Sequence, residues 1–188
     1  MNLETTLSQG ARKELTELYP YLLPRNAFTG QVHKDYDYSY VVGEHDLPPG
    51  WFKLFLQCCE HLKSTLVEYG KLHSFYFTQV KEKYGLLRMY TSGGNKEVYD
   101  ILDKYSFLSK QVCCECGKPA KYQSTGYVCP YCSDCVSKSG EPLDKHLPII
   151  PHTKYATTIR NNGVEEEVLI SVENEWNTYM ERLNDNEV

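Results

Sequence analysis

The chain has 188 residues, of which 41% are hydrophobic, and a formal net charge of −5 at pH 7. This length suits one domain, or one domain with a small metal-stapled appendage, and no apolar run is long enough for a membrane-spanning helix. Polar residues follow Met1 where a secretory signal would have an apolar run, so we expect a cytoplasmic protein whose eight cysteines stay reduced.

The first fifty residues contain one short helical pattern and a long irregular stretch. Apolar residues recur between Gln9 and Tyr19, and Pro20 stops the pattern, which predicts a short helix. From Asp35 to Tyr40, acidic or polar residues alternate with tyrosines. This alternation fits a strand and fits equally well a loop that is ordered by tyrosine packing.

The clearest helix follows Pro48 and Pro49 and ends at Gly70, a residue typical of helix C-termini. Its apolar residues recur at steps of three and four and so form one stripe. The members of the stripe are Trp51, Phe55, Cys58, Leu62, Leu66 and Tyr69.

A β-hairpin and another helix are predicted next. Two runs rich in aromatic and β-branched residues, 74–80 and 86–91, predict the hairpin, with its turn within residues 81–85. Asn95 is a good N-cap for the helix that follows. The apolar stripe of that helix consists of Val98, Ile101, Leu102, Tyr105 and Leu108.

Two pairs of closely spaced cysteines are the strongest signal in the chain. Cys113 and Cys116 form one Cys-x2-Cys pair, Cys132 and Cys135 form the other, and fifteen residues separate the pairs. This spacing is typical of four thiolates that hold one zinc ion. Because four protein ligands leave no position for water or substrate, we expect the zinc to be structural rather than catalytic.

Two neighbouring cysteines leave the ligand set open to alternatives. The spacing of Cys114 from Cys116 is too short for the usual ligand turn, which favours Cys113 as the ligand. Cys129 forms a legitimate alternative pair with the first cysteine of the second pair, and would then replace Cys135. A disulfide cluster is a further interpretation, but such clusters belong to secreted proteins.

The C-terminal part reads as a connection, a hairpin and a helix. Residues 140–151 form a proline-rich connection, and the runs 154–159 and 164–171 flank an Asn-Asn-Gly turn signal at 161–163. An amphipathic helix is predicted over residues 172–183.

The negative charge of the chain is concentrated at this end. Residues Glu165 to Val188 include eight acidic residues and one basic residue, whereas Met1 to Val164 include seventeen acidic and nineteen basic residues, a net charge of +2. Non-specific binding to nucleic acid needs a basic surplus, so the overall charge disfavours a nucleic-acid partner and leaves only a local basic patch for one.

These elements predict an α+β protein in which helices pack on a small antiparallel sheet, with a zinc-ribbon-like insertion held by four cysteines. We divide the chain into an N-terminal helix with an irregular segment (1–47), a helix–hairpin–helix core (48–110), a zinc-binding segment (111–140) and a C-terminal hairpin with an acidic helix (141–188).

No catalytic motif is present: the sequence lacks a phosphate-binding loop, a dinucleotide-binding glycine signature, His-Glu-x-x-His and Gly-x-Ser-x-Gly. Cys58 and Cys59 fall in an apolar helix pattern, where buried thiols are ordinary. A thiol–imidazole pair with His61 is disfavoured because such close neighbours on a helix do not face each other. We therefore predict no catalytic residue.

Cations and tyrosines gather around the first predicted hairpin. Such an arrangement suits the recognition of phosphates or bases, or of an acidic protein partner. An ordinary solvated turn, with Arg88 paired to Glu82 or Glu97, is the alternative. The candidate binding residues are Lys81 and Lys83, placed beside the turn, with Tyr84, Arg88 and Tyr90.

The sequence FTQVKEKYGLLRMY, from Phe77 to Tyr90, resembles the VKEKFGGLRFY stretch of a poorly characterised family of small phage and bacterial proteins. In those proteins a Gly-Trp helix precedes this stretch, and a second helix and a Cys-x-x-Cys-Gly segment follow it. The matching parts of this chain are Gly50–Trp51, the helical pattern from Glu97 to Ser109, and Cys113 to Gly117, with the second cysteine pair after them.

The resemblance covers roughly Pro48 to Cys135. The chain departs from the family at Tyr84, where the family has phenylalanine, and at Leu86, where it has a second glycine. The resemblance implies a phage or prophage accessory protein, but it supplies no activity and no catalytic residue.

We therefore expect a non-enzymatic, zinc-stapled binding protein of phage type. It would inhibit host defence in the host cytoplasm, either by binding a host protein or by sequestering a phosphate-bearing nucleotide signal. A zinc-ribbon module that binds nucleic acid and an enzyme that acts on a nucleotide are the alternatives.

Overall fold

The computed structural model describes residues 7–149 and, for the backbone alone, residues 154–161 and 164–171. Within this part of the chain, three α-helices and three small antiparallel sheets form an α+β protein, which confirms the predicted fold class. None of the described helices is both long enough and apolar enough to cross a membrane. The helix predicted over 172–183 lies outside the described residues.

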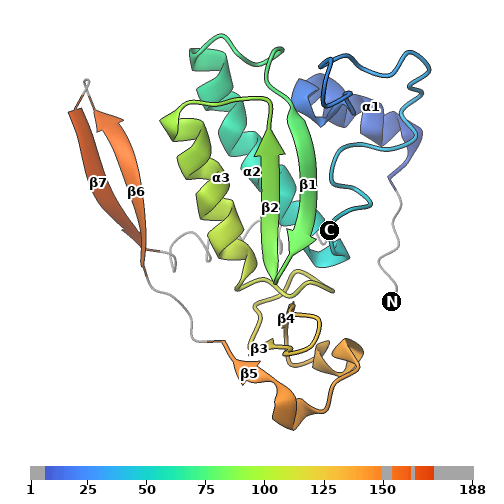
Figure 1. Ribbon diagram of the computed structural model, residues 1–188, viewed down its shortest axis with the longest axis vertical. Helices are drawn as coiled ribbons and strands as arrows, with labels where there is room; N and C mark the ends of the chain where they lie inside the picture. The colour runs from blue at the N-terminus through green and yellow to red at the C-terminus, as the bar shows by residue number, and fades with distance from the viewer. Residues whose placement is uncertain (1–6, 150–153, 162–163, 172–188) are drawn as a thin grey trace.

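Two helices and one hairpin form the centre of the molecule (Figure 1). Helix α2 (Pro49–Glu68) packs beside helix α3 (Lys96–Ser109). The antiparallel hairpin of strands β1 (Phe77–Lys83) and β2 (Leu86–Thr91) lies across them. One face of the hairpin is thus covered by helices, and the other faces away from them.

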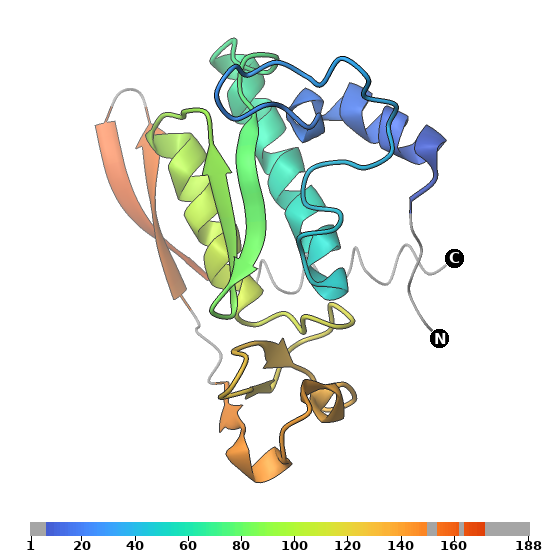
Figure 2. The same cartoon turned by 45° about the vertical axis from the view of Figure 1, so that its right-hand side comes forward.

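A smaller unit lies at the end of this layer, next to the turn of the hairpin (Figure 2). Strands β3 (Tyr122–Gln123), β4 (Pro130–Tyr131) and β5 (Leu147–Pro148) form a three-stranded antiparallel sheet in the order β4-β3-β5. Two 3-10 helices, η2 (Val136–Ser139) and η3 (Leu143–Lys145), connect β4 to β5. The residues between the cysteine pairs therefore form a small hairpin, and it gains a third strand from the connection.

Strands β6 (Lys154–Asn161) and β7 (Val164–Ser171) form the predicted C-terminal hairpin. The hairpin stands beside α3 and is not hydrogen-bonded to either of the other sheets (Figure 1). The sequence does not indicate whether the C-terminal hairpin extends the sheet of β1 and β2. In the structure these two hairpins form separate sheets.

Local signals begin and end the helices as the sequence predicts. Asn95 caps α3 by accepting a 3.0 Å hydrogen bond from the backbone N–H of Val98. At the end of α2, Gly70 has a φ of +61°, and the N–H groups of Gly70 and Lys71 donate to the carbonyls of Val67 and Leu66, respectively. These two bonds satisfy carbonyls that a helix end leaves free, in a motif that favours glycine.

The turn of the β1–β2 hairpin is shorter than predicted. Only Tyr84 and Gly85 form it, with φ angles of +54° and +72°, so it is a two-residue turn with both φ angles positive. Lys81 and Lys83, which we expected beside the turn, are instead paired residues of β1. Strand β1 also begins later than predicted, at Phe77.

The core lies between the hairpin and the helices. Trp51 and Phe55 of α2, and Val80 and Leu87 of the hairpin, are at most 1% exposed. Tyr69, predicted to continue the stripe of α2, is 42% exposed because the helix ends one residue before it. Edge-to-face aromatic contacts join Tyr21, Phe55, Phe75 and Phe77.

Helix α1 (Gln9–Leu18) and the 3-10 helix η1 (Pro20–Leu22) precede an irregular segment. Of the two interpretations of residues 35–40, the structure has the loop and no strand. The ring centroids of Tyr36 and Tyr38 lie 5.0 Å apart, and the Tyr36 hydroxyl donates to the carbonyl of Tyr40. Tyrosine packing therefore orders this segment.

A buried ion pair, which no local sequence pattern indicates, ties α1 to the irregular segment. The guanidinium of Arg12 forms three hydrogen bonds of 2.8–3.1 Å with the carboxylate of Glu44, and both side chains are less than 10% exposed. Burial opposes the ionisation of Glu44, but hydrogen bonds from Arg12 and from the N–H of Val41 hold its pKa below the usual value.

We predict that Glu44→Gln lowers stability at neutral pH and weakens its dependence on acid. A carboxylate with a lowered pKa stabilises the fold above the pKa of an unfolded glutamate, about 4.3. This contribution fades as the pH falls through the folded-state pKa. Urea unfolding at pH 7 and pH 4 measures both effects, with exposed Glu14→Gln on α1 as the matched control. Equal losses on acidification in Glu44→Gln and the wild type would contradict this.

Candidate metal centre and binding face

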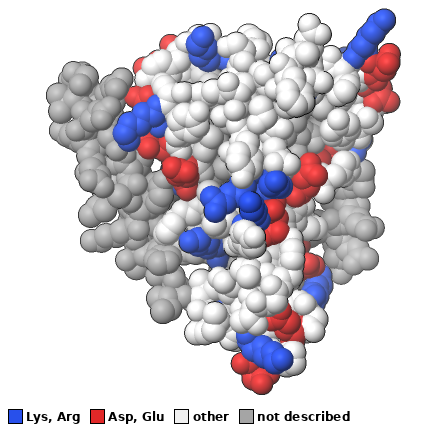
Figure 3. All heavy atoms as spheres, in the orientation of Figure 1, with Lys and Arg blue, Asp and Glu red and all other residues white. Residues whose placement is uncertain are grey.

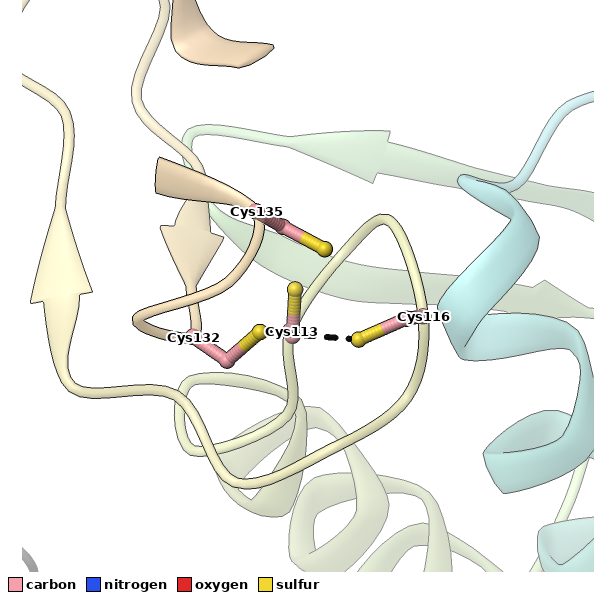
Figure 4. A group of neighbouring side chains, drawn as sticks. All are labelled: Cys113, Cys116, Cys132 and Cys135. Atoms are coloured by element: carbon pink, nitrogen blue, oxygen red, sulfur yellow. Dashed lines mark hydrogen bonds between the residues drawn. The ribbon is translucent and has the colours of Figure 1, made fainter. Parts of the chain in front are cut away.

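The structure brings the thiols of Cys113, Cys116, Cys132 and Cys135 together. All four sulfur atoms lie within 4.8 Å of one another, and those of Cys116 and Cys132 are 3.6 Å apart (Figure 4). A tetrahedral ion with metal–sulfur bonds of about 2.3 Å separates its ligands by about 3.8 Å. The cluster is therefore compatible with one tetrahedral metal ion.

Each cysteine pair lies on a tight turn that directs both thiols inward. In the first turn, the N–H of Gly117 donates to the carbonyl of Cys113 over 2.9 Å, and Gly117 itself has a φ of +76°. In the second, the N–H of Val136 donates to the carbonyl of Cys132 over 3.0 Å. Glycine serves the first turn because a side chain disfavours this positive φ.

Burial makes it unfavourable for these thiols to ionise unless a cation lies beside them. Burial raises the pKa of the Cys113 thiol to about 12. Burial also opposes ionisation of Cys132, but hydrogen bonds from the Cys116 thiol and from the N–H groups of Asp134 and Cys135 hold its pKa below the usual value. Metal ligation requires deprotonated thiols, so a bound cation would offset the cost of burying their charge.

The two remaining cysteines of this segment lie outside the cluster. Cys114 and Cys129 are each 2% exposed, and a hydrogen bond between their thiols, together with burial, raises the pKa of Cys114. Their backbones serve the small sheet: the N–H of Cys114 donates to Pro130, and that of Cys129 donates to Ser124 Oγ. All eight cysteines lie within the described residues and are free thiols, so the structure contains no disulfide cluster.

Helix α2 packs directly on the first cysteine turn. The N–H of Gly50 donates to the carbonyl of Cys114 over 2.8 Å, and the indole N–H of Trp51 donates to the carbonyl of Val112 over 2.9 Å. A Cβ atom on Gly50 would lie 2.2 Å from the carbonyl oxygen of Cys113 and 2.5 Å from the N of Gly117. The centre thus sits against the helix that carries the core.

The hairpin contacts the metal-binding segment from the other side. Glu82 accepts hydrogen bonds from the N–H of Gly85 and from the hydroxyl of Tyr127. A Cβ atom on Gly85 would lie 3.0 Å from the side chain of Val128. The position of the hairpin turn therefore depends on the segment that the metal would order.

The candidate binding residues lie on the outer face of the hairpin, although Tyr84 belongs to its turn. Lys81 stands directly opposite Arg88, and Tyr90 stands opposite Gln79. Basic side chains gather in the middle of this face (Figure 3). We call this surface the cation face: Lys81, Lys83, Tyr84, Arg88 and Tyr90.

Acidic side chains border the basic side chains of this face (Figure 3). Among the described residues, none of Lys81, Lys83 and Arg88 forms an ion pair. The alternative, Arg88 paired to Glu82 or Glu97, is not among the ion pairs of the described residues, and Glu82 instead accepts from Gly85 and Tyr127. Arg88 does act on Asp103, whose pKa is nevertheless raised, chiefly by burial.

Tyrosine rings accompany the lysines. The ammonium of Lys81 lies 5.7 Å from the ring centroid of Tyr90, and that of Lys83 lies 5.7 Å from the ring centroid of Tyr84. Tyr84 is 75% exposed and Tyr90 is 44% exposed. The face thus offers aromatic rings and cations side by side.

The thiols of Cys58 and Cys59 lie in the core, as their place in an apolar helix pattern predicts. Cys58 and Cys59 are fully buried, and burial raises the pKa of each thiol. The Nδ1 atom of His61 lies 3.1 Å from the hydroxyl of Tyr105. Buried, protonated thiols of this kind are poor nucleophiles.

Sequence reasoning missed a surface cavity of about 490 Å³ at the end of the hairpin away from its turn. Leu66, Phe75 and Val98 contribute apolar lining, and Lys71 and the loop 92–95 contribute polar lining. No local pattern could have revealed the cavity, because its lining comes from residues of both helices and from segments beside the hairpin.

Comparison with known proteins found no matching family model, no matching curated protein and no matching solved structure. The resemblance to phage and bacterial proteins therefore remains an expectation from the sequence.

We predict that Cys132→Ser loses the metal ion, whereas Cys129→Ser keeps it. The two cysteines lie close together in one segment, but only Cys132 points into the cluster. Native mass spectrometry should find one ion per chain in the wild type and in Cys129→Ser, and well below one in Cys132→Ser. An ion-free wild type, or equal metal content in the two variants, would refute the assignment.

We also predict that Gly50→Ala destabilises the fold by about 3 kcal/mol, since backbone atoms that cannot move aside occupy the place of the new methyl group. Gly10→Ala is the matched control, because its Cβ would meet only Ser8 Oγ at 3.9 Å. It should be neutral or stabilise by about 0.5 kcal/mol. Urea unfolding measures both, and similar values for the two variants would show that the close approach is unimportant.

Proposed function

We propose that the metal is zinc and that its role is structural. Four thiolates in a tetrahedral arrangement suit zinc, and they leave no coordination position for a substrate. The segment from Cys113 to Cys135 has little regular structure of its own, with two-residue strands at β3 and β4. Bound zinc would supply the folding energy that so short a segment cannot obtain from a core.

We propose further that the protein is a non-enzymatic binding protein that holds a phosphate-bearing nucleotide on the cation face. The observation that carries this proposal is the pairing of Lys81 directly opposite Arg88. Like charges across a strand pair are destabilising, and none of the described residues forms an ion pair with either of them. A bound phosphate would relieve this repulsion.

The conformation of Tyr84 supports the same site. Its φ of +54° is uncommon for a bulky residue, and the turn position that it occupies is normally filled by Asn, Asp or Gly. With 75% exposure, the ring gains little from burial in compensation. An exposed ring in a costly conformation beside the ammonium of Lys83 suits stacking against a base whose phosphate binds Lys83 and Arg88.

The resemblance to phage proteins supplies a context for this activity. In a host cell, a protein that sequesters a phosphate-bearing signal would act against a host process such as defence. A host protein with an acidic or phosphorylated surface is the second candidate ligand, because the same cations would bind it.

We predict that the double variant Lys83→Ala/Arg88→Ala weakens nucleotide binding at least about tenfold, since hydrogen bonds to charged groups contribute roughly 1.5–3 kcal/mol each. Both side chains are exposed, so the fold should survive. Lys13→Ala, which removes an exposed lysine of α1, is the matched control. Titration calorimetry with ATP and with cyclic dinucleotides measures the effect. Unchanged affinity in the double variant would show that the nucleotide does not bind at the cation face.

Native mass spectrometry of protein purified from a cytosolic host identifies the ligand. Zinc together with a second mass that denaturation releases would support nucleotide sequestration. Zinc alone, with no binding of any nucleotide in the panel, would overturn it in favour of a protein partner. Binding of a short oligothymidine with a steep salt dependence would instead indicate a nucleic-acid module.

A further inference from the structure

The cation face is matched in charge by a segment of the same chain. Residues 172–188 contain five acidic residues and one basic residue, Arg182. On the described outer face of the hairpin, the strand residues are Gln79, Lys81, Lys83, Leu86, Arg88 and Tyr90, with no acidic residue among them.

We propose that the acidic segment 172–188 occupies the cation face when no ligand is bound and competes with the ligand for it. The inference rests on the proposed function, since it concerns the regulation of the same site. The segment would act as an internal mimic of the phosphate-bearing ligand, and the ligand would have to displace it.

The path of the chain brings the segment within reach. Strand β7 ends at Ser171, which pairs with Lys154 at the start of β6. Strand β6 lies beside α3, and α3 packs against β2, which carries Arg88 (Figure 1). A further seventeen residues can span roughly 55 Å when extended. The segment therefore starts at a hairpin that lies beside α3, the helix on which β2 packs.

Tethering makes even a weak contact effective. A segment joined by a short linker has an effective concentration of about 1 mM. A contact with a dissociation constant of about 0.1 mM would then be occupied roughly nine-tenths of the time, and it would weaken ligand binding about tenfold.

The spacing of the first acidic residues fits the face. Glu173 and Glu175 are two positions apart, as are Lys81 and Lys83. The sequence predicts a helix over 172–183, so the proposal requires the start of this segment to bind in extended form, in which residues two apart project to one side with a separation of about 6.8 Å. A short extended stretch could therefore place one carboxylate near each ammonium, which is the charge-assisted contact that a phosphate would otherwise make.

Two variants test the competition. One is the chain ending at Ser171, and the other is the full chain with Glu173→Gln and Glu175→Gln, which keeps every other residue in case the shorter chain fails to fold. Calorimetric titration with ATP at low salt should show about tenfold tighter binding to the truncated chain and a smaller gain in the double variant. Glu14→Gln/Glu17→Gln, two exposed changes on α1, is the matched control and should bind as the wild type does.

A second measurement needs no ligand. Zero-length carbodiimide coupling at micromolar protein concentration should join Lys81 or Lys83 to a carboxylate within 172–188. Mixing isotopically labelled and unlabelled chains shows whether each crosslink lies within one chain.

The outcomes separate the two proposals. Equal ATP affinity of the full and truncated chains, with no such crosslink, would overturn the inference and leave the nucleotide site standing. Crosslinks between different chains would overturn it in favour of a second copy as the occupant. If neither chain binds a nucleotide, the proposed function fails, and the presence or absence of the intrachain crosslink still decides whether the segment occupies the face.

Discussion

The close approach of helix α2 to the first cysteine turn is the constraint on which the rest of the structure depends. At Gly50 there is no room for a side chain, and the indole of Trp51 is hydrogen-bonded to Val112 while its ring is completely buried. The helix that organises the core thus also fixes the turn that holds two of the four clustered thiols. On the opposite side, Tyr127 bonds to Glu82 of the hairpin. Because the segment that carries the four thiols is held from both sides, a metal ion bound there would also stabilise the position of the hairpin turn.

The hairpin combines a well-packed inner face with an outer face that breaks local rules. Val80 of β1 and Leu87 of β2 are both buried against the helices, which stabilises the inner face of the hairpin. On the other side, two cations face each other, and Tyr84 adopts a positive φ while largely exposed. Local costs that lie close together on an exposed surface are typical of functional surfaces. An acidic segment in the same chain carries charge opposite to that of this face, and the proposed competition for the face rests on this complementarity.

Several elements were predictable because their causes are local. The cap at Asn95, the helix end at Gly70 and the Cys-x2-Cys spacing each depend on a few neighbouring residues, and each has the predicted role in the structure. The predicted turn is longer than the observed one because tyrosine is an unusual residue in a two-residue turn. The sequence therefore predicts Lys81 and Lys83 beside the turn, whereas both belong to β1. Nothing near Arg12 in the sequence indicates that it would be buried against Glu44, thirty-two positions away.

The sequence by itself determined the fold class, the helix boundaries set by caps and glycines, and the region of closely spaced cysteines, because periodicity, capping and ligand spacing act over a few residues. Only the tertiary structure decided that Cys114 and Cys129 stay outside the cluster, that α2 carries the first cysteine turn, and that Lys81 faces Arg88. The first two outcomes depend on contacts between distant segments. The third depends on strand register, because a shift of one residue would turn each side chain of the strand to the opposite face.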